Sequence, residues 1–275
     1  MHNDGLMKNT DSSAATQPTP SSASQATSVA SGARVAIVTG SSRGIGAAIA
    51  RRLAADGLAV IVNYAGRAAD AEKIVEAIRA AGGRALAVRA DVSSPAEAGT
   101  LFARAGEAFG GVDVVVNNAG IMQPGLVPLA DTDDALFDRL FAINVKGTFN
   151  TLRLAAKHLR AGGRIVNFST SVVGLAPPGY AAYAATKSAV ETLTRIFAKE
   201  LRGRSISVNA VAPGPTATDL FLNGKTPEQI EHLARIAPLE RLGQPEDIAG
   251  VVSFLVGPDG GWVNGQTLRA NGGMV

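Results

Sequence analysis

The sequence predicts an α/β fold, a single doubly wound domain built on a parallel, seven-stranded sheet. Short runs rich in Val, Ile and Leu alternate with longer amphipathic segments from residue 34 onward, which is typical of strands joined by crossover helices. A length of 275 residues suits one α/β domain. Hydrophobic residues make up 46% of the chain and aromatic residues only 5%, so we expect an aliphatic, Ala- and Gly-packed core.

Seven runs have the length and the aliphatic content of strands that helices cover on both faces. In chain order the expected strands are Arg34–Thr39, Ala59–Asn63, Arg84–Arg89, Val112–Val116, Arg164–Ser169, Ile206–Val211 and Gln266–Arg269. The segments between them carry apolar residues at helical spacing. The expected helices are Gly44–Ala55, Ala68–Ala81, Pro95–Phe109, Val145–Arg160, Tyr183–Leu201 and Pro245–Val256.

The first 33 residues differ from the rest of the chain. They hold 17 Ser, Thr or Ala residues and no aromatic residue. Such a segment buries too little apolar surface to offset its loss of conformational entropy, so we predict a disordered tail over 1–33 and a dinucleotide-binding catalytic domain over 34–275. The tail lacks the apolar stretch of a secretory signal and the arginines of a transit peptide, so the expected location is cytoplasmic.

Composition excludes several classes of function. The chain has no Cys and only three His, which disfavours disulfides, a thiol nucleophile and a metal site. The net charge of +3 comes without a basic block, so no nucleic-acid partner is expected. No run approaches the roughly 18 apolar residues of a membrane span. A small-molecule partner remains.

A glycine-rich segment, Thr39–Gly46, connects the first expected strand to the first expected helix. Glycines let a backbone turn tightly beside a pyrophosphate, and the helix N-terminus offers free N–H groups to the anion. The spacing is GxxxGxG, and its position is typical of a Rossmann dinucleotide-binding domain. The candidate cofactor-binding residues here are Gly40, Ser42, Arg43, Gly44, Ile45 and Gly46.

The end of the second strand predicts which dinucleotide is bound. A site for NAD carries a carboxylate there to hold the ribose 2′-hydroxyl, and none occurs between residues 57 and 69. The strand ends instead in Asn63 and Tyr64, Arg67 follows, and Arg43 lies in the glycine-rich segment. Guanidinium groups bind a 2′-phosphate, so the expected cofactor is NADP(H).

Two further strand ends supply candidate cofactor contacts, because ligands of open parallel sheets bind beyond the carboxyl ends of the strands. Asp91 and Val92 follow the third strand, where an adenine ring could be flanked. Asn118, Ala119 and Gly120 follow the fourth strand.

Tyr183 and Lys187 lie four residues apart in an expected helix, which places the phenol and the ammonium on one face. A nearby cation stabilises a phenolate, so we expect Lys187 to lower the pKa of Tyr183. Tyr183 is therefore a candidate general acid or base.

These motifs occur in a fixed order together with Asn144, the hydroxyl cluster Ser169-Thr170-Ser171, Pro213-Gly214, the segment Arg241–Ala249 and the closing glycines. From Arg34 to Val275 the chain resembles the short-chain dehydrogenase/reductase superfamily, in particular its 3-oxoacyl-carrier-protein-reductase-like and glucose-dehydrogenase-like members. The resemblance implies an NADP-dependent oxidoreductase that interconverts a ketone and a secondary alcohol by hydride transfer. It also implies a homotetramer.

The resemblance implies a role for each matching residue. Tyr183 would exchange a proton with the substrate oxygen, Lys187 would hold the nicotinamide ribose, and Asn144 would support a proton path through Lys187. Pro213 and Gly214 are further candidate cofactor contacts, and Thr216 and Thr218 could bind the nicotinamide carboxamide or the phosphates.

The hydroxyl that orients the substrate is ambiguous. The usual spacing of 13 residues before the Tyr leads to Thr170, whereas Ser171 begins a family-like Ser-x-x-Gly segment. We favour Ser171 and keep Thr170 as the alternative. A second departure is Asn271, where the family commonly has Asp.

A different class of function uses the same scaffold: a dinucleotide-sensing protein without turnover. Such a sensor needs the glycine-rich turn but not Asn144, Tyr183 and Lys187, and this disfavours it. An epimerase or dehydratase would usually carry a larger substrate domain than the roughly 60 residues after Val211 provide.

Overall fold

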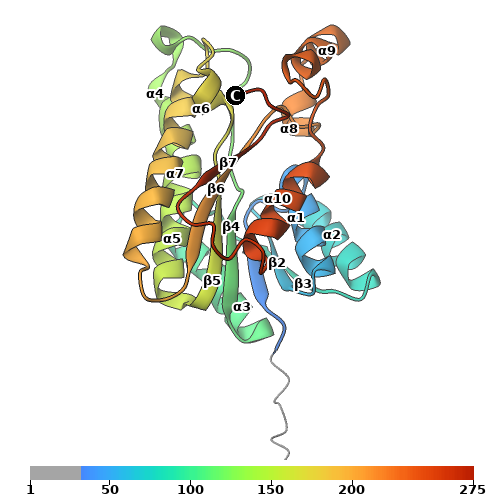
Figure 1. Cartoon of the computed structure of the whole chain (residues 1–275), viewed down its shortest axis with the longest axis vertical. Coiled ribbons are helices and arrows are strands. Elements are labelled where there is room, and N and C mark those ends of the chain that lie inside the picture. The colour runs from blue at the N-terminus through green and yellow to red at the C-terminus, as the bar shows by residue number, and fades with distance from the viewer. Residues whose placement is uncertain (1–31) are drawn as a thin grey trace, which may run out of the picture. The chain divides into compact units, whose positions relative to one another are not determined.

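The computed structural model describes residues 32–275, which form one seven-stranded parallel sheet. The strands are β1 (Val35–Val38), β2 (Ala59–Tyr64), β3 (Arg84–Arg89), β4 (Val112–Asn117), β5 (Leu159–Phe168), β6 (Ser207–Pro213) and β7 (Thr267–Ala270). Their order in the sheet is β3-β2-β1-β4-β5-β6-β7, with every neighbouring pair parallel (Figure 1). The predicted doubly wound fold is confirmed. Residues 1–31 of the expected tail lie outside the described residues.

Helices cover both faces of the sheet (Figure 1). They are α1 (Gly44–Ala55), α2 (Ala68–Ala80), α3 (Pro95–Phe109), α4 (Asp134–Leu140), α5 (Gly147–His158), α6 (Val172–Leu175), α7 (Ala181–Glu200), α8 (Asp219–Leu222), α9 (Pro227–Ile236) and α10 (Pro245–Val256). One hydrophobic core joins α1, α2 and α10 to the sheet. A second core joins α3, α5 and α7 to the opposite face. The strands are buried between the two layers, as their unbroken aliphatic runs require.

The region between β4 and β5 differs most from expectation. We predicted one helix over Val145–Arg160, whereas the structure has α4, a π-helical turn over Phe141–Lys146, and then α5. Strand β5 begins at Leu159, ahead of the predicted Arg164, because Leu159 pairs with Val112 across an irregularity in the ladder. The π-helical turn carries the candidate residue Asn144, and such turns recur at functional sites.

The helices α4, α6, α8 and α9 were not predicted. Two of them, α6 and α8, have only four residues, too few for a helical period to show. The start of α9 could have been found in the sequence, because Thr226, Pro227 and Gln229 form a capping box with Pro at the first turn. In residues 32–275, no helix has the length and apolar content that crossing a membrane requires.

Candidate active site

The glycine-rich turn lies at the carboxyl end of β1, between the ends of β2 and β4. Gly40 has a φ of +62°, which L side chains rarely adopt. A Cβ at this position would lie 2.8 Å from the Cα of Ala119, and one at Gly46 would lie 2.5 Å from the Gly40 carbonyl oxygen. Both glycines are therefore required for the turn to pack against the end of β4.

Two asparagine side chains hold this turn from behind. The Nδ2 of Asn118 donates to the carbonyl oxygens of Thr39 and Gly40, both at 3.0 Å. The Oδ1 of Asn63 accepts from the Gly40 N–H at 3.0 Å, and its Nδ2 donates to the Ala90 carbonyl at 3.0 Å. Both amides are thus engaged with the backbone, and they shape the cofactor turn.

The N-terminus of α1 is open for an anion. Arg43 occupies the N-cap position and no side chain caps the first turn of the helix, so its N–H groups point outward unpaired by a cap. The Arg43 side chain is exposed, and Ser42 and Ile45 are partly exposed beside it. Thr218 reaches this turn from the other end of the chain, since a Cβ at Gly44 would lie 3.4 Å from Thr218 Cγ2.

The outer end of the site carries the residues expected around an adenosine. Arg67 is exposed at the start of α2, with Asp70 as a weak partner at 3.5 Å. Tyr64 is partly exposed at the end of β2. Asp91 is exposed and accepts from the N–H and the hydroxyl of Ser93, while Val92 beside it is buried.

Tyr183, Lys187 and Thr170 meet at the inner end. The Nζ of Lys187 lies 5.9 Å from the centre of the Tyr183 ring, one helical turn away on α7. It donates to the Phe168 carbonyl oxygen at 2.9 Å, at the end of β5. Thr170 Oγ1 accepts from the Val172 N–H at 3.3 Å, and its hydroxyl lies close enough to the Tyr183 phenol to lower the pKa of that group. Helix α7 thus places the Tyr183 phenol beside Thr170.

Burial controls the pKa values of this pair. Desolvation raises the pKa of Tyr183 to about 12, although the hydrogen bond from Thr170 opposes the shift. Desolvation lowers the pKa of Lys187 to about 8. The expected lowering of the Tyr183 pKa by Lys187 is not seen in the chain by itself, because the ammonium faces a carbonyl oxygen and desolvation of the phenol outweighs other causes.

Ser171 is hydrogen-bonded through its hydroxyl to β6 and to the segment after β7. Its side chain is 2% exposed, its hydroxyl donates to the Ala212 carbonyl at 3.3 Å, and it accepts from Asn271 Nδ2 at 3.0 Å. Its N–H donates to the Pro213 carbonyl at 2.9 Å. Of the two hydroxyls that the sequence left open, Thr170 is therefore the one beside the phenol, whereas the sequence favoured Ser171.

Asn144 lies in the π-helical turn and is fully buried. Its Oδ1 accepts from the Ile121 N–H at 2.8 Å, and its Nδ2 donates to the Ile121 carbonyl at 2.9 Å and to Thr186 Oγ1 at 3.1 Å. A Cβ at Gly120 would lie 3.2 Å from Asn144 Oδ1 and 3.4 Å from Lys187 Nζ. Gly120 therefore lets the chain after β4 pass beside the Lys187 ammonium.

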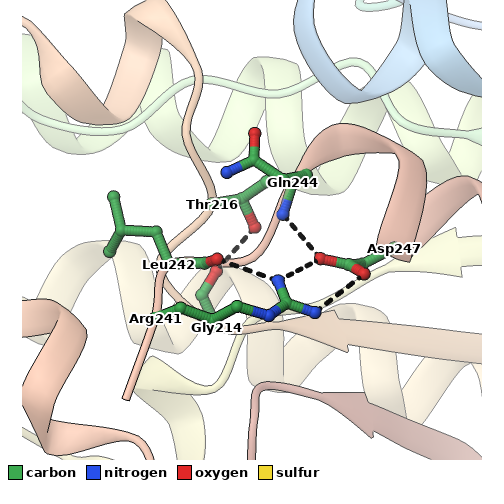
Figure 2. A network of polar contacts seen from close by, with 6 residues as sticks. All are labelled: Gly214, Thr216, Arg241, Leu242, Gln244 and Asp247. Atoms are coloured by element: carbon green, nitrogen blue, oxygen red, sulfur yellow. Dashed lines mark hydrogen bonds and ion pairs between the residues drawn. The ribbon is translucent and has the colours of Figure 1, made fainter. Parts of the chain in front are cut away.

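The loop after β6 is closed at its base by a bridge between Thr216 and Gly243. Figure 2 shows the ion pair that holds this base: Arg241 donates to both carboxylate oxygens of Asp247, at 2.6 and 3.0 Å. The Gln244 N–H donates to the same carboxylate at 2.7 Å. The guanidinium of Arg241 holds the pKa of Asp247 below its usual range. Thr216 is buried there, and its hydroxyl donates to the Gly214 carbonyl at 3.0 Å (Figure 2).

Sequence reasoning missed the polar contacts of two residues at this end of the sheet. Glu191 accepts from the Ser169 hydroxyl at 2.6 Å, and Asn271 reaches Ser171 from the segment after β7. The departure at Asn271 was noted, but no pattern in the sequence places residue 271 beside residue 171.

Comparisons with known proteins identify the family of this chain. The family described as Enoyl-(Acyl carrier protein) reductase matches residues 40–275. A short-chain type dehydrogenase/reductase of Picea abies is 46% identical over 252 residues, covering 89% of this chain and 93% of that one. An Arabidopsis thaliana NADPH-dependent aldehyde reductase-like protein, named chloroplastic, is 46% identical over 254 residues, covering 88% and 94%.

A solved structure is also similar. A short-chain dehydrogenase of Burkholderia cenocepacia in complex with NADP has a TM-score of 0.82 and 39% identity, and the match covers 88% of this chain and 97% of that one. The chain belongs to the short-chain dehydrogenase/reductase family.

The buried ammonium of Lys187 gives a prediction about stability. Because its pKa is about 8 in the folded chain and near 10.5 when exposed, the unfolded chain binds more protons between these values. Wild-type stability should therefore rise with pH across this window, while the cost of burying the charge is fully present below pH 8. Lys187→Met should lack this rise, which amounts to on the order of 3 kcal/mol.

Chemical denaturation of both proteins at pH 7 and pH 10 measures the effect. Lys199→Met, at an exposed position of α7, is the matched control and should keep the wild-type pH dependence. An equal pH dependence for wild type and Lys187→Met would contradict the assignment of this cost to Lys187.

Proposed function

We propose that the protein is an NADPH-dependent reductase that converts a carbonyl compound, a ketone or an aldehyde, to the alcohol. The observation that carries this proposal is the joint placement of Thr170, Tyr183 and Lys187 at the carboxyl edge of the sheet that also bears the glycine-rich turn. The printed names of similar proteins, which include an NADPH-dependent aldehyde reductase, support the reaction class.

NADPH fits the donor set of the site. The open N-terminus of α1 suits a pyrophosphate, and exposed Arg43 and Arg67 suit a 2′-phosphate at the end of a strand without a carboxylate. When bound, the cofactor supplies the hydride. The chain's own residues then bind the substrate, exclude water and provide one proton.

Tyr183 is the proton donor in this proposal. With its pKa raised to about 12, the phenol is protonated at neutral pH and can donate to the substrate oxygen as the carbonyl carbon is reduced. Thr170, beside the phenol, would donate to the same substrate oxygen and orient it. Lys187, held by the Phe168 carbonyl, is placed to bind the ribose of the cofactor and to supply a proton to the Tyr183 phenolate after each turnover. Oxidation of the alcohol needs the phenolate and is favoured at higher pH.

The alternative is a dinucleotide sensor on the same scaffold. A sensor would bind NADPH through the turn and the two arginines without needing Thr170 against Tyr183. Consumption of NADPH, followed at 340 nm with a panel of aldehydes and ketones, separates the two functions. Turnover supports the reductase, and binding without turnover of any carbonyl supports the sensor.

Tyr183→Phe should lower kcat for carbonyl reduction by roughly 10²–10⁴-fold, because the ring remains and the hydroxyl that supplies the proton is lost. The Kd for NADPH, measured by fluorescence titration, should stay near the wild-type value. Tyr180→Phe, at the neighbouring ring 6.4 Å away, is the matched control and should keep most of the activity. Near-normal turnover by Tyr183→Phe would show that this residue is not the proton donor.

The two hydroxyls give a second prediction. Thr170→Ala should reduce kcat by roughly 10²-fold, as expected when a donor to the reacting oxygen is removed. Ser171→Ala should have a smaller effect, because its hydroxyl is engaged by Ala212 and Asn271. Steady-state kinetics of both variants decide the assignment, and a larger loss for Ser171→Ala would reverse it.

Cofactor choice gives a third prediction. NADPH should bind more tightly than NADH, and Arg43→Ala or Arg67→Ala should each weaken NADPH binding by on the order of 1.5–3 kcal/mol while leaving NADH nearly unchanged. Arg51→Ala is the matched control: Arg51 lies about two turns further along α1, where it faces Glu246. Equal affinity of the wild-type protein for the two cofactors would rule out a 2′-phosphate site.

A homotetramer in the cytoplasm remains part of the proposal. Most apolar side chains of α5 and α7 are used within the subunit, since Leu152 is buried and Leu154, Leu193 and Phe197 pack against its core. Ile196 and Phe149 remain 51% and 37% exposed, respectively.

The mass in solution tests the assembly. Light scattering at low micromolar concentration should give about four times 28.0 kDa, because exposed apolar side chains on two neighbouring helices favour a symmetric interface. A mass near 28.0 kDa would exclude any stable oligomer, and twice that value would leave a dimer.

A further inference from the structure

The segment after β7, residues 271–275, packs directly on the loop that carries Thr170. A Cβ at Gly214 would lie 2.9 Å from the Cα of Asn271, so the two backbones approach as closely as a glycine permits. The Gly214 N–H donates to the Ala270 carbonyl at 3.0 Å. At the other end of the segment, a Cβ at Gly174 would lie 2.6 Å from Val275 Cγ1. Figure 1 accordingly shows the C-terminus beside α6.

The side chain of Asn271 has a fixed polarity. Its Oδ1 accepts from the Gly273 N–H at 3.1 Å, and a backbone N–H can only donate. Its Nδ2 must therefore face Ser171, whose oxygen accepts at 3.0 Å. The Ser171 hydroxyl proton is then directed to the Ala212 carbonyl. The Ser171 hydroxyl thus accepts from the C-terminal segment and donates to β6.

The backbone on each side of Thr170 is tied to β6. The N–H of Ser169 donates to the Val211 carbonyl at 2.8 Å, and the N–H of Ser171 donates to the Pro213 carbonyl at 2.9 Å. These bonds extend the parallel ladder beyond the end of β5. Thr170 lies between these two anchored residues and beside the Tyr183 phenol, whose pKa it lowers. Asn271 adds a side-chain hydrogen bond to Ser171, one of these two anchored residues.

We infer that Asn271 is a positioning residue that acts through Ser171 to hold Thr170 against Tyr183 in the geometry of the reaction. This inference rests on the proposed reductase function. It assigns to the C-terminal segment a part in catalysis although no residue of that segment touches the reacting atoms. A hydroxyl displaced by a fraction of an ångström loses its alignment with the substrate oxygen, so the effect falls on kcat.

The experiment compares Asn271→Leu, Asn271→Asp and Ser171→Ala. Asn271→Leu keeps the side-chain size and removes the bond, and Ser171→Ala removes the same bond from the other side. Each should lower kcat about ten-fold, with the Kd for NADPH unchanged. The double variant should be no slower than the slower single variant. Asn271→Asp should retain most of the activity, because a carboxylate accepts from both the Ser171 hydroxyl and the Gly273 N–H.

Asn264→Leu is the matched control. Asn264 precedes β7 as Asn271 follows it, and it accepts from the Val208 N–H at 2.9 Å without reaching the catalytic loop. Its loss should lower the melting temperature and leave kcat unchanged at temperatures below unfolding. The pH profile of alcohol oxidation is a further readout: its basic limb should move to higher pH in Asn271→Leu, since the Thr170 hydrogen bond that favours the phenolate is weakened.

A wild-type kcat in both Asn271→Leu and Ser171→Ala would overturn the inference while leaving the proposed function intact. The same is true if the two losses multiply in the double variant, because independent effects mean that the residues do not act through one bond. If Asn271→Leu does not fold, Ser171→Ala and Asn271→Asp still decide the outcome. A wild-type protein that reduces no carbonyl would instead reject the proposed function.

Discussion

The hydrogen bonds from Asn118 Nδ2 to the Thr39 and Gly40 carbonyls are the contacts on which the cofactor end of the molecule depends. A tight turn between a buried strand and a helix leaves carbonyl groups without ladder partners, and a buried carbonyl without a partner is costly. The next strand in the sheet supplies the missing donor. The turn can then be compact, with Gly46 within van der Waals reach of the Asn118 amide, and the first N–H groups of α1 stay free.

The inner end of the site depends on the opposite effect, a buried charge with little compensation. Lys187 is 5% exposed, and the Phe168 carbonyl is its hydrogen-bond acceptor. Burial disfavours the charged form of both side chains, the Lys187 ammonium and the Tyr183 phenolate. The pKa of Lys187 is therefore lowered and that of Tyr183 is raised. An anionic or hydroxyl-bearing partner placed at Lys187 would relieve this cost, so the binding of a ligand there and the stability of the chain are linked.

The sequence predicted the seven strands and the layer arrangement, because these follow from the hydrophobic period, and it led us to expect a site at the carboxyl edge of the sheet. It could not predict how each polar side chain is used. Asn63 and Asn118 end strands as ligand-binding residues do, yet their amides face the backbone. Thr170 and Ser171 differ by one position, and only the ladder to β6 determines which of them faces Tyr183.

The alignment of α7 with β5 explains why the catalytic pair and Thr170 coincide. Asn167 Nδ2 donates to Thr194 Oγ1 at 2.8 Å, deep in the layer between strand and helix. Thr194 lies two helical turns beyond Lys187, and Asn167 lies three residues before Thr170. A second bond, from Lys187 Nζ to the Phe168 carbonyl, joins the same two elements nearer the edge. Two bonds at different heights fix both the translation and the rotation of a rigid helix on its strand. The packing of α7 on β5 therefore brings the phenol to Thr170, and no contact between loops is required for this. The C-terminal segment then has to restrain only the backbone turn after Ser169.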